Sequence, residues 1–448
     1  MTQPTGARDG ARRTDRRAQV PRTDDLLATD AAVEAIRTFG RRYAKSIVHE
    51  VQDAVRTGEI EPDQVADELR VRLGRGLVGV RRVLNGTGVL IHTNLGRSPM
   101  SRAALAAIDT AAGTCDLELD LRTGRRGRRG ESVAAALLAE VAPAAGVHVV
   151  NNGAAALALV AAALGDGGEV IVSRGELIEI GAGFRIPDLI EATGARIKEV
   201  GTTNRTHLSD YRNAIGEDTR LIFKIHPSNY RVEGFTAGVS VAELSTLGIP
   251  VVSDIGSGLL HPHPMLPAEP DATTHLAAGA AIVTASSDKL LGGPQAGLIF
   301  TASEDAAQTL KRHPMSRAYR VDKLTLAALE ATVAGPPAPV ITMLETPPAQ
   351  LRERADLVVS QLPGLDAVVV DTRSTVGGGG APGVEFPSCG ISLPAQLGPA
   401  LRSAPVPVVA RVESGRCIVD LRAIDPADLD QLVESVRHAA LAAGRHDG

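Results

Sequence analysis

The chain has 448 residues, 44% of them apolar and 22% charged, which is the composition of a globular protein with a large buried core. With 47 Lys and Arg against 52 Asp and Glu, the net charge of −5 excludes a generally basic protein that coats nucleic acid, and leaves local basic patches as the contact sites for RNA. Three widely spaced cysteines argue against a disulfide framework or zinc site and favour a cytoplasmic location, and no uncharged apolar run reaches the roughly 18 residues that span a membrane.

The N-terminal part of the chain changes from a basic tail to a helical pattern. Residues 1–22 hold six arginines against two aspartates, which predicts a disordered basic tail. Helical periodicity then appears three times, at 24–40, 41–58 and 62–74, each time closed near a glycine. The pattern predicts a small helical domain over residues 23–78.

Short apolar runs alternate with Ala- and Leu-rich helices through the middle of the chain. Strands that are buried on both faces and separated by helices are typical of a mostly parallel α/β sheet. In such sheets, ligands bind outside the carboxyl ends of the strands. We therefore expect a catalytic α/β domain over residues 79–337. Its predicted strands are 147–152, 169–173, 196–200, 220–226, 250–256, 280–286 and 296–300.

A proline-rich segment, GPPAPV at 335–340, marks the end of that domain. A helix at 348–361 and a strand at 367–371 follow, then the flexible glycine-rich stretch VGGGGAPG at 376–383 and the strand pair VPVVARV and RCIVDL. The pattern predicts a small α+β domain over residues 338–448.

A lysine and an aspartate follow successive predicted strands. Lys289 lies in SSDKLLGGPQAG, and Asp254 ends the preceding apolar strand. Pyridoxal phosphate enzymes require this pair, because the lysine amine forms a Schiff base with the cofactor aldehyde while the aspartate keeps the pyridine nitrogen protonated. The alternative is a surface lysine and an aspartate that caps a helix.

Five further residues offer contacts to a cofactor phosphate. The strand at 147–152 passes through Asn151, Asn152 and Gly153 into an alanine-rich helix, whose first backbone N–H groups have no helical partner. Ser286 and Ser287, just before the lysine, offer two hydroxyl donors. An ordinary strand-to-helix turn is the alternative interpretation of the first group.

Eight stretches together resemble the bacterial selenocysteine synthase family, the L-seryl-tRNA(Sec) selenium transferases. They cover most of residues 80–335 in the family's order, whereas one short motif would be weak support. They are LNGTGVLIHTNLGRSPMS, VNNGAAA, VIVSRGELIEIGAGFRIPDLIEATGA, VGTTNRTHLSDY, KIHPSNYRVEGFT, SDIGSG, SSDKLLGGPQAG and RAYRVDKLTLAALEAT.

The resemblance implies the fold and the partners. It implies the aminotransferase-like fold, fold type I, of pyridoxal phosphate enzymes, with Lys289 as the Schiff-base lysine, a helical N-terminal domain that grips tRNA, and a ring-shaped homodecamer. It also implies that Arg97, Arg317 and Arg320 bind the selenophosphate anion, and the last two, three positions apart, suit one helical face or one turn. The loop at 122–132 is richer in arginine than the family pattern.

The implied reaction converts L-seryl-tRNA(Sec) to L-selenocysteinyl-tRNA(Sec). Water is eliminated to give an aminoacrylyl-tRNA, and selenium from selenophosphate adds to its double bond. Lys289 removes the α-proton, and His226 and His92 are candidates to stack on the cofactor ring or assist departure of the hydroxyl. The alternatives are a pyridoxal phosphate lyase or aminotransferase that acts on a free amino acid, and a non-catalytic RNA-binding protein.

Overall fold

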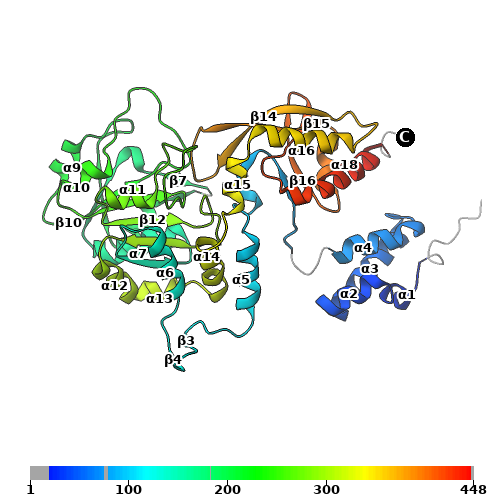
Figure 1. Cartoon of the computed structure of the whole chain (residues 1–448), viewed down its shortest axis with the longest axis horizontal. Helices are drawn as coiled ribbons and strands as arrows, with labels where there is room; N and C mark the ends of the chain where they lie inside the picture. The colour runs from blue at the N-terminus through cyan, green and yellow to red at the C-terminus, as the bar shows by residue number, and fades with distance from the viewer. Residues whose placement is uncertain (1–19, 75–78, 182, 445–448) are drawn as a thin grey trace, which may run out of the picture. The chain divides into compact units, whose positions relative to one another are not determined.

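The structure, a computed structural model, describes residues 20–74, 79–181 and 183–444 (Figure 1). The chain divides into two compact units, which are described separately. One runs to Val83 and includes Ser403–Pro407, and the other comprises Leu84–Arg402 and the chain from Val408 onward. Most of the predicted tail at 1–22 lies outside the described residues. Among the described helices, none combines the length and the apolarity that crossing a bilayer requires.

The first unit is helical, as the periodicity predicted. The first periodic segment is divided in two because the hydroxyl of Thr29 accepts a hydrogen bond from the Ala32 N–H and begins a new helix there. Gly58, with a φ of 76°, ends the longest helix. Buried Val48 and Leu69 belong to its shared apolar core. The helices are α1 (Thr23–Leu27), α2 (Asp30–Phe39), α3 (Arg41–Thr57) and α4 (Val65–Gly74), with a 3-10 turn at Pro62–Gln64.

All seven predicted strands of the middle region form one sheet, in the order β5-β13-β12-β11-β10-β6-β9. Its pairs are parallel except those of β13, which runs antiparallel to both neighbours. The prediction of a mostly parallel sheet is confirmed. The strands are β5 (Gly146–Val150), β6 (Glu169–Ser173), β9 (Arg196–Val200), β10 (Thr219–Ile225), β11 (Val251–Gly256), β12 (Ile282–Ser286) and β13 (Gly297–Thr301).

Two apolar layers cover this sheet, one on each face. Strand residues alternate between them, so that Ile171 belongs to one layer and its neighbours Val170 and Val172 to the other. The alanine-rich α7 (Gly153–Gly165) is buried along most of its length in the second layer. The other contributing helices are α6 (Glu131–Glu140), α8 (Ile186–Glu191), α9 (Leu208–Ala214), α10 (Val241–Ser245), α11 (Ala272–Ala277), α12 (Glu304–Arg312) and α14 (Lys323–Val333).

A second sheet has six strands in the order β1-β16-β17-β15-β14-β2. Residues 84–91, expected in the domain over 79–337, lie here instead, because β1 pairs with β16 and β2 with β14. Helices α16 (Pro348–Ser360) and α18 (Leu429–Gly444) lie beside this sheet (Figure 1). The strands are β1 (Leu84–Gly86), β2 (Val89–Ile91), β14 (Val368–Gly377), β15 (Glu385–Pro394), β16 (Val408–Glu413) and β17 (Arg416–Asp420).

The remaining elements are short. The helices are α5 (Arg102–Ala112), α13 (Pro314–Ala318), α15 (Pro339–Glu345) and α17 (Leu397–Ser403), and two small ribbons pair β3 (Leu119–Asp120) with β4 (Arg125–Arg126) and β7 (Glu179–Ile180) with β8 (Phe184–Arg185). The ribbon of β3 and β4 lies within the arginine-rich loop at 122–132 and the segment before it.

Replacement of Phe300 by alanine tests how much the core of the seven-stranded sheet contributes to stability. Phe300 is fully buried on the antiparallel strand β13, so the loss of its ring leaves a cavity and should lower the free energy of unfolding by about 3–5 kcal/mol. Urea unfolding followed by circular dichroism measures this change. Leu357→Ala on the exposed side of α16, where the side chain is 52% exposed, should have almost no effect. Equal losses in the two variants would contradict this account of the core.

Candidate active site

Asp254 lies in β11, and Lys289 follows the neighbouring parallel strand β12. In the β11–β12 ladder Asp254 lies opposite Thr284, whose hydroxyl donates to the Asp254 Oδ1 at 2.8 Å. Burial raises the pKa of Asp254, while the hydrogen bond from Thr284 and the charge of Lys289 oppose that shift. The carboxylate therefore lies in a site that disfavours its charge unless cations or donors accompany it.

Lys289 follows the end of β12, and glycines surround its amine. A Cβ on Gly379 would lie 2.5 Å from the Lys289 Nζ, and one on Gly256 would lie 3.6 Å from it. Ser98 holds the backbone of Lys289 by donating to its carbonyl oxygen. Burial lowers the pKa of Lys289, against the charges of Asp254 and Asp288. A lowered pKa increases the fraction of neutral amine, the form that acts as nucleophile or base.

Several buried polar atoms near this pair have no hydrogen-bond partner among the described residues. They are the His92 Nδ1, His226 Nε2, Ser257 Oγ and Glu269 Oε1. The His226 N–H donates to the Asp254 carbonyl oxygen at 2.9 Å, and the N–H of the residue after Lys289 donates to the Ser257 carbonyl oxygen at 2.8 Å. Unpartnered buried polar atoms are rare in proteins, and a bound water, ion or polar ligand is among the explanations for them. The residues present thus fit a cofactor with several polar groups, as pyridoxal phosphate has.

The start of α7 lies against the end of β12. A Cβ on Gly153 would lie 2.5 Å from the Ser286 Oγ, so only glycine permits this approach. The Asn152 side chain caps α7 by accepting the Ala155 N–H at 2.8 Å. The Ser286 hydroxyl and the N–H groups of the first turn therefore face the same region, which suits a phosphate.

Two other predicted phosphate ligands have structural partners. The Asn151 N–H donates to the Tyr319 carbonyl oxygen at 3.0 Å. Ser287 is fully buried, and its hydroxyl donates to the Pro294 carbonyl oxygen. Ser286, rather than Ser287, is thus the serine that faces α7.

Arg97 lies beside the lysine. Its Nη1 is 2.5 Å from the Asp288 Oδ2, and its backbone has a φ of 67°, which is uncommon for a residue with a side chain. Both Arg97 and Asp288 line a small cavity of about 330 Å³ with Thr93 and Gln295. The guanidinium of Arg97 is therefore neutralised by the residue that precedes Lys289.

Arg317 and Arg320 line a different and larger cavity, of about 880 Å³. Arg317 lies in α13, and Arg320 lies beyond its end in a bridge with Val150, the last residue of β5. Arg317 and Arg320 share a cavity but not a helical face. Arg97 does not line this cavity, since β5 is at the edge of the sheet, two strands from β12. Other basic residues of this cavity are Arg126, Arg128, Arg129, Lys311, Arg312, His148 and His313.

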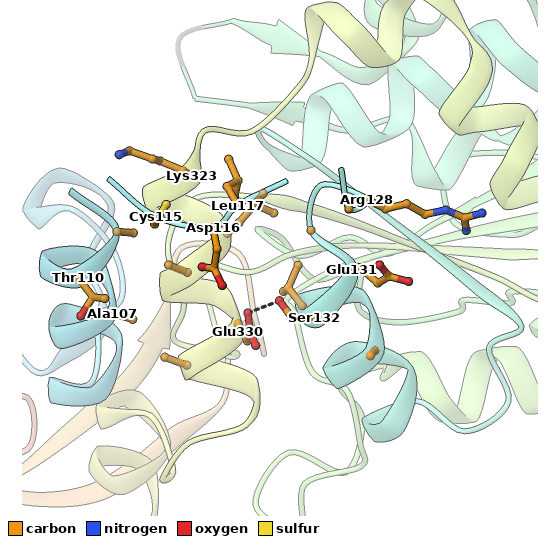
Figure 2. A pocket seen from close by; sticks show the side chains of 18 of the residues that line it. Ala107, Thr110, Cys115, Asp116, Leu117, Arg128, Glu131, Ser132, Lys323 and Glu330 are labelled. Carbon is orange, nitrogen blue, oxygen red and sulfur yellow. Dashed lines mark hydrogen bonds between the residues drawn. The ribbon is translucent and has the colours of Figure 1, made fainter. Parts of the chain in front are cut away.

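A third cavity, of about 870 Å³, lies between α5, α6 and α14. Figure 2 shows Ser132 of α6 and Glu330 of α14 pointing toward one another, with their hydrogen bond of 2.6 Å. Cys115 and Lys323 lie at its border. None of the predicted site residues lines this cavity.

Two family models match this chain, one over its N-terminal part and one over most of the remainder. Residues 83–425 match the family model of L-seryl-tRNA selenium transferase, and residues 17–56 match that of the selenocysteine synthase N terminal. The chain belongs to the L-seryl-tRNA selenium transferase family. Relatives with the name L-seryl-tRNA(Sec) selenium transferase include those of Geobacter sulfurreducens, 40% identical over 94% of this chain and 99% of the relative, and of Carboxydothermus hydrogenoformans, 40% identical over 92% and 95%.

A solved structure agrees in fold. D-glucosaminate-6-phosphate ammonia-lyase superposes with a TM-score of 0.58 at 19% identity, over 82% of this chain and 97% of that one. The predicted fold class, a mostly parallel α/β sheet in a chain with a helical N-terminal part, is confirmed, and the main part of the chain shares its fold with this solved structure.

Four residues of the site were absent from the sequence prediction. Thr284 and Asp288 lie in or beside the stretch that contains Lys289, so their position was a usable signal. Glu269 and Gly379 carry no such signal, because only the folded chain brings them near this family member's lysine.

The buried side chain of His148 should make the stability of the protein depend on pH. Its Nε2 lies 2.8 Å from the Ser316 Oγ, and burial, aided by the charge of Lys311, lowers its pKa to about 4 from the usual 6.5. Between these values the unfolded chain binds the proton and the folded chain does not, so stability falls as the pH drops from about 6.5 toward 4. Between pH 7 and 5 the stability of His148→Gln should fall by about 2 kcal/mol less than that of wild type, as urea unfolding at both pH values measures. An identical loss in both proteins would contradict the assignment.

Proposed function

We propose that this protein converts L-seryl-tRNA(Sec) to L-selenocysteinyl-tRNA(Sec) with pyridoxal phosphate as cofactor and selenophosphate as selenium donor. The observation that carries the proposal is the buried pair of Lys289 and Asp254 on neighbouring strand ends, in a chain of the L-seryl-tRNA selenium transferase family. The product serves selenoprotein synthesis, and the site of action is the cytoplasm, where aminoacyl-tRNA is used.

Each end of the cofactor has residues to hold it. Lys289 would bind the aldehyde carbon, Asp254 the pyridine nitrogen, and Ser286 with the first turn of α7 the phosphate. When bound, the cofactor supplies an electron sink for a carbanion at the α-carbon of the seryl group.

The side chains of this protein handle the protons. The Lys289 amine, with its lowered pKa, takes the proton from the seryl α-carbon and returns one at the end of the reaction. The Thr284 hydroxyl stabilises the ionised form of Asp254 against burial. His226, whose Nε2 lies 3.3 Å from the Glu269 Oε2, and His92 are the candidates to protonate the departing hydroxyl.

Arg317 and Arg320 suit the selenium donor. Neither has a carboxylate within 4.0 Å among the ion pairs of the described residues, whereas Arg97 is paired with Asp288. Guanidinium groups bind small oxyanions through paired hydrogen bonds. We assign selenophosphate first to Arg317 and Arg320, and Arg97 can join them only by leaving Asp288.

The same cavity has room for part of the tRNA. Its volume of about 880 Å³ greatly exceeds that of a selenophosphate, and Arg128, Lys311 and Arg312 also line it without carboxylate partners in the described chain. Backbone phosphates of RNA are the natural counter-ions for such a group. We propose that these three residues bind the acceptor end, while the helical N-terminal unit grips the tRNA body and ten subunits assemble in a ring.

The second candidate is a lyase or aminotransferase that acts on a free amino acid with the same Lys289 and Asp254. One incubation separates the two functions. Purified protein with pyridoxal phosphate, seryl-tRNA(Sec) and selenophosphate should yield selenocysteinyl-tRNA(Sec). Conversion of free serine with no need for tRNA would overturn the proposal in favour of the second candidate.

Replacement of Lys289 by alanine should abolish the absorbance of the lysine-bound cofactor and reduce selenium transfer by about a thousandfold or more, because both the anchor and the base are removed. Spectroscopy and a single-turnover assay measure these effects. Lys198→Ala, which removes a lysine paired with Glu169 at 3.0 Å on the far part of the sheet, serves as the control. Survival of the band in Lys289→Ala would contradict the assignment.

Replacement of both Lys311 and Arg312 by alanine should weaken binding of seryl-tRNA(Sec) and leave the KM for selenophosphate unchanged. For every RNA phosphate that is no longer neutralised, the slope of log K against log salt should become shallower by roughly 0.7–0.9. Filter binding at several salt concentrations measures the slope. Arg196→Ala, at an arginine paired with Asp218 at 2.9 Å, is the matched control. An unchanged slope in the double variant would remove these residues from the tRNA site.

A further inference from the structure

A run of four glycines, residues 377–380, reaches the Lys289 amine through Gly379. Gly379, with a φ of 99°, lies so close that its Cβ would be 2.5 Å from the lysine Nζ. A Cβ on Gly378 would lie 2.4 Å from the Thr93 Oγ1, and its N–H donates to the Ile91 carbonyl oxygen at 3.2 Å. The glycine run therefore contributes bare backbone to the site, because glycine has no side chain.

A buried carboxylate lies directly behind these glycines. The Glu269 side chain is 1% exposed, and its Oε2 accepts the Ala381 N–H at 2.7 Å and lies 3.3 Å from the His226 Nε2. Its Oε1 has no hydrogen-bond partner within the described chain. The charge of Glu269 also acts on Lys289, which places it within electrostatic reach of the reacting amine. The negative charge of the site thus comes from Glu269 as well as Asp254.

The nearby cations are already paired. Arg97 binds Asp288, and Arg231, which packs against Gly383 at the other end of the glycine-rich segment, lies 3.4 Å from Glu233. A free amino acid brings a carboxylate, and a buried carboxylate needs cationic donors. An ester of the same amino acid brings none.

We propose that Glu269 and the glycine run at 377–380 select an esterified amino acid by excluding a free α-carboxylate. This inference rests on the proposed function and deepens it, because it names the feature of seryl-tRNA that the site recognises. Like charges brought together without water between them repel strongly, which is enough to discriminate between two ligands that differ by one charge. Glu269 acts here as a specificity-determining residue, and the bare glycines leave room for the esterified ribose.

The test compares L-serine with L-serine methyl ester on the cofactor-loaded protein. Each ligand is titrated while the cofactor absorbance is recorded, and the ratio of the two Kd values is taken. Glu269→Gln keeps the shape and removes the charge, so the preference for the ester should fall by about tenfold. Because the basicity of each ligand's amine is the same for every variant, the change in ratio reports on the site alone.

Three variants complete the design. Glu269→Ala removes the same charge without introducing the glutamine amide, and it should also reduce the preference for the ester. Glu269→Asp keeps the charge and should keep a preference close to that of wild type. Glu140→Gln, at an exposed carboxylate 3.2 Å from the His261 Nε2, should match wild type.

The outcomes separate this inference from the proposed function. An unchanged ratio in both Glu269→Gln and Glu269→Ala, with wild type active on seryl-tRNA(Sec), would overturn the inference alone. Loss of the cofactor absorbance in both variants would also overturn it, by assigning Glu269 to cofactor retention. Failure of wild type to transfer selenium would instead overturn the proposed function.

Discussion

The charges of Asp254 and Lys289 lie in an interior that favours neither of them. Burial raises the pKa of the first and lowers that of the second, and each charge partly offsets the cost of the other. Parallel pairing of β11 with β12 places the two residues at the same edge of the sheet, and Thr284 supplies a hydrogen bond to the carboxylate. Burying two ionisable groups lowers the stability of a fold. The Asp254 carboxylate and the Lys289 amine are useful nevertheless, because cofactor binding and proton transfer can use both.

Close backbone approaches build the rest of the site around this pair. Gly153 brings the first turn of α7 against Ser286, and Gly379 brings the second sheet against the lysine amine. Glu269 fixes the segment that carries Gly379 through the Ala381 N–H, and it lies against His226 on the other side. The two sheets thus meet at the reacting amine, and the buried carboxylate of Glu269 lies at their junction.

Much of the fold was predictable because the local pattern of apolar and polar residues indicates which segments are buried. Most strands of the middle sheet are buried on both faces, so short apolar runs identified them, and the edge strand β9 was found although it holds three charged residues. Strands β1 and β2 within residues 84–91 were not predicted, since their partners β14 and β16 lie near the other end of the chain and no local pattern reports such pairing. Arg317 and Arg320 line one cavity without sharing a helical face, because α13 ends at Ala318.

The amino-acid sequence by itself determined the family, the strands and the helical N-terminal unit, because residue type, order and periodicity are local properties, and it predicted Lys289 and Asp254 as the catalytic pair. The tertiary structure alone decided which groups surround the lysine. It pairs Arg97 with Asp288, turns Ser287 toward Pro294, and buries Glu269 behind a glycine run from the second sheet. Arg97 and Asp288 are far apart in the chain, as are Glu269 and Ala381, so these contacts depend on packing that the sequence does not report.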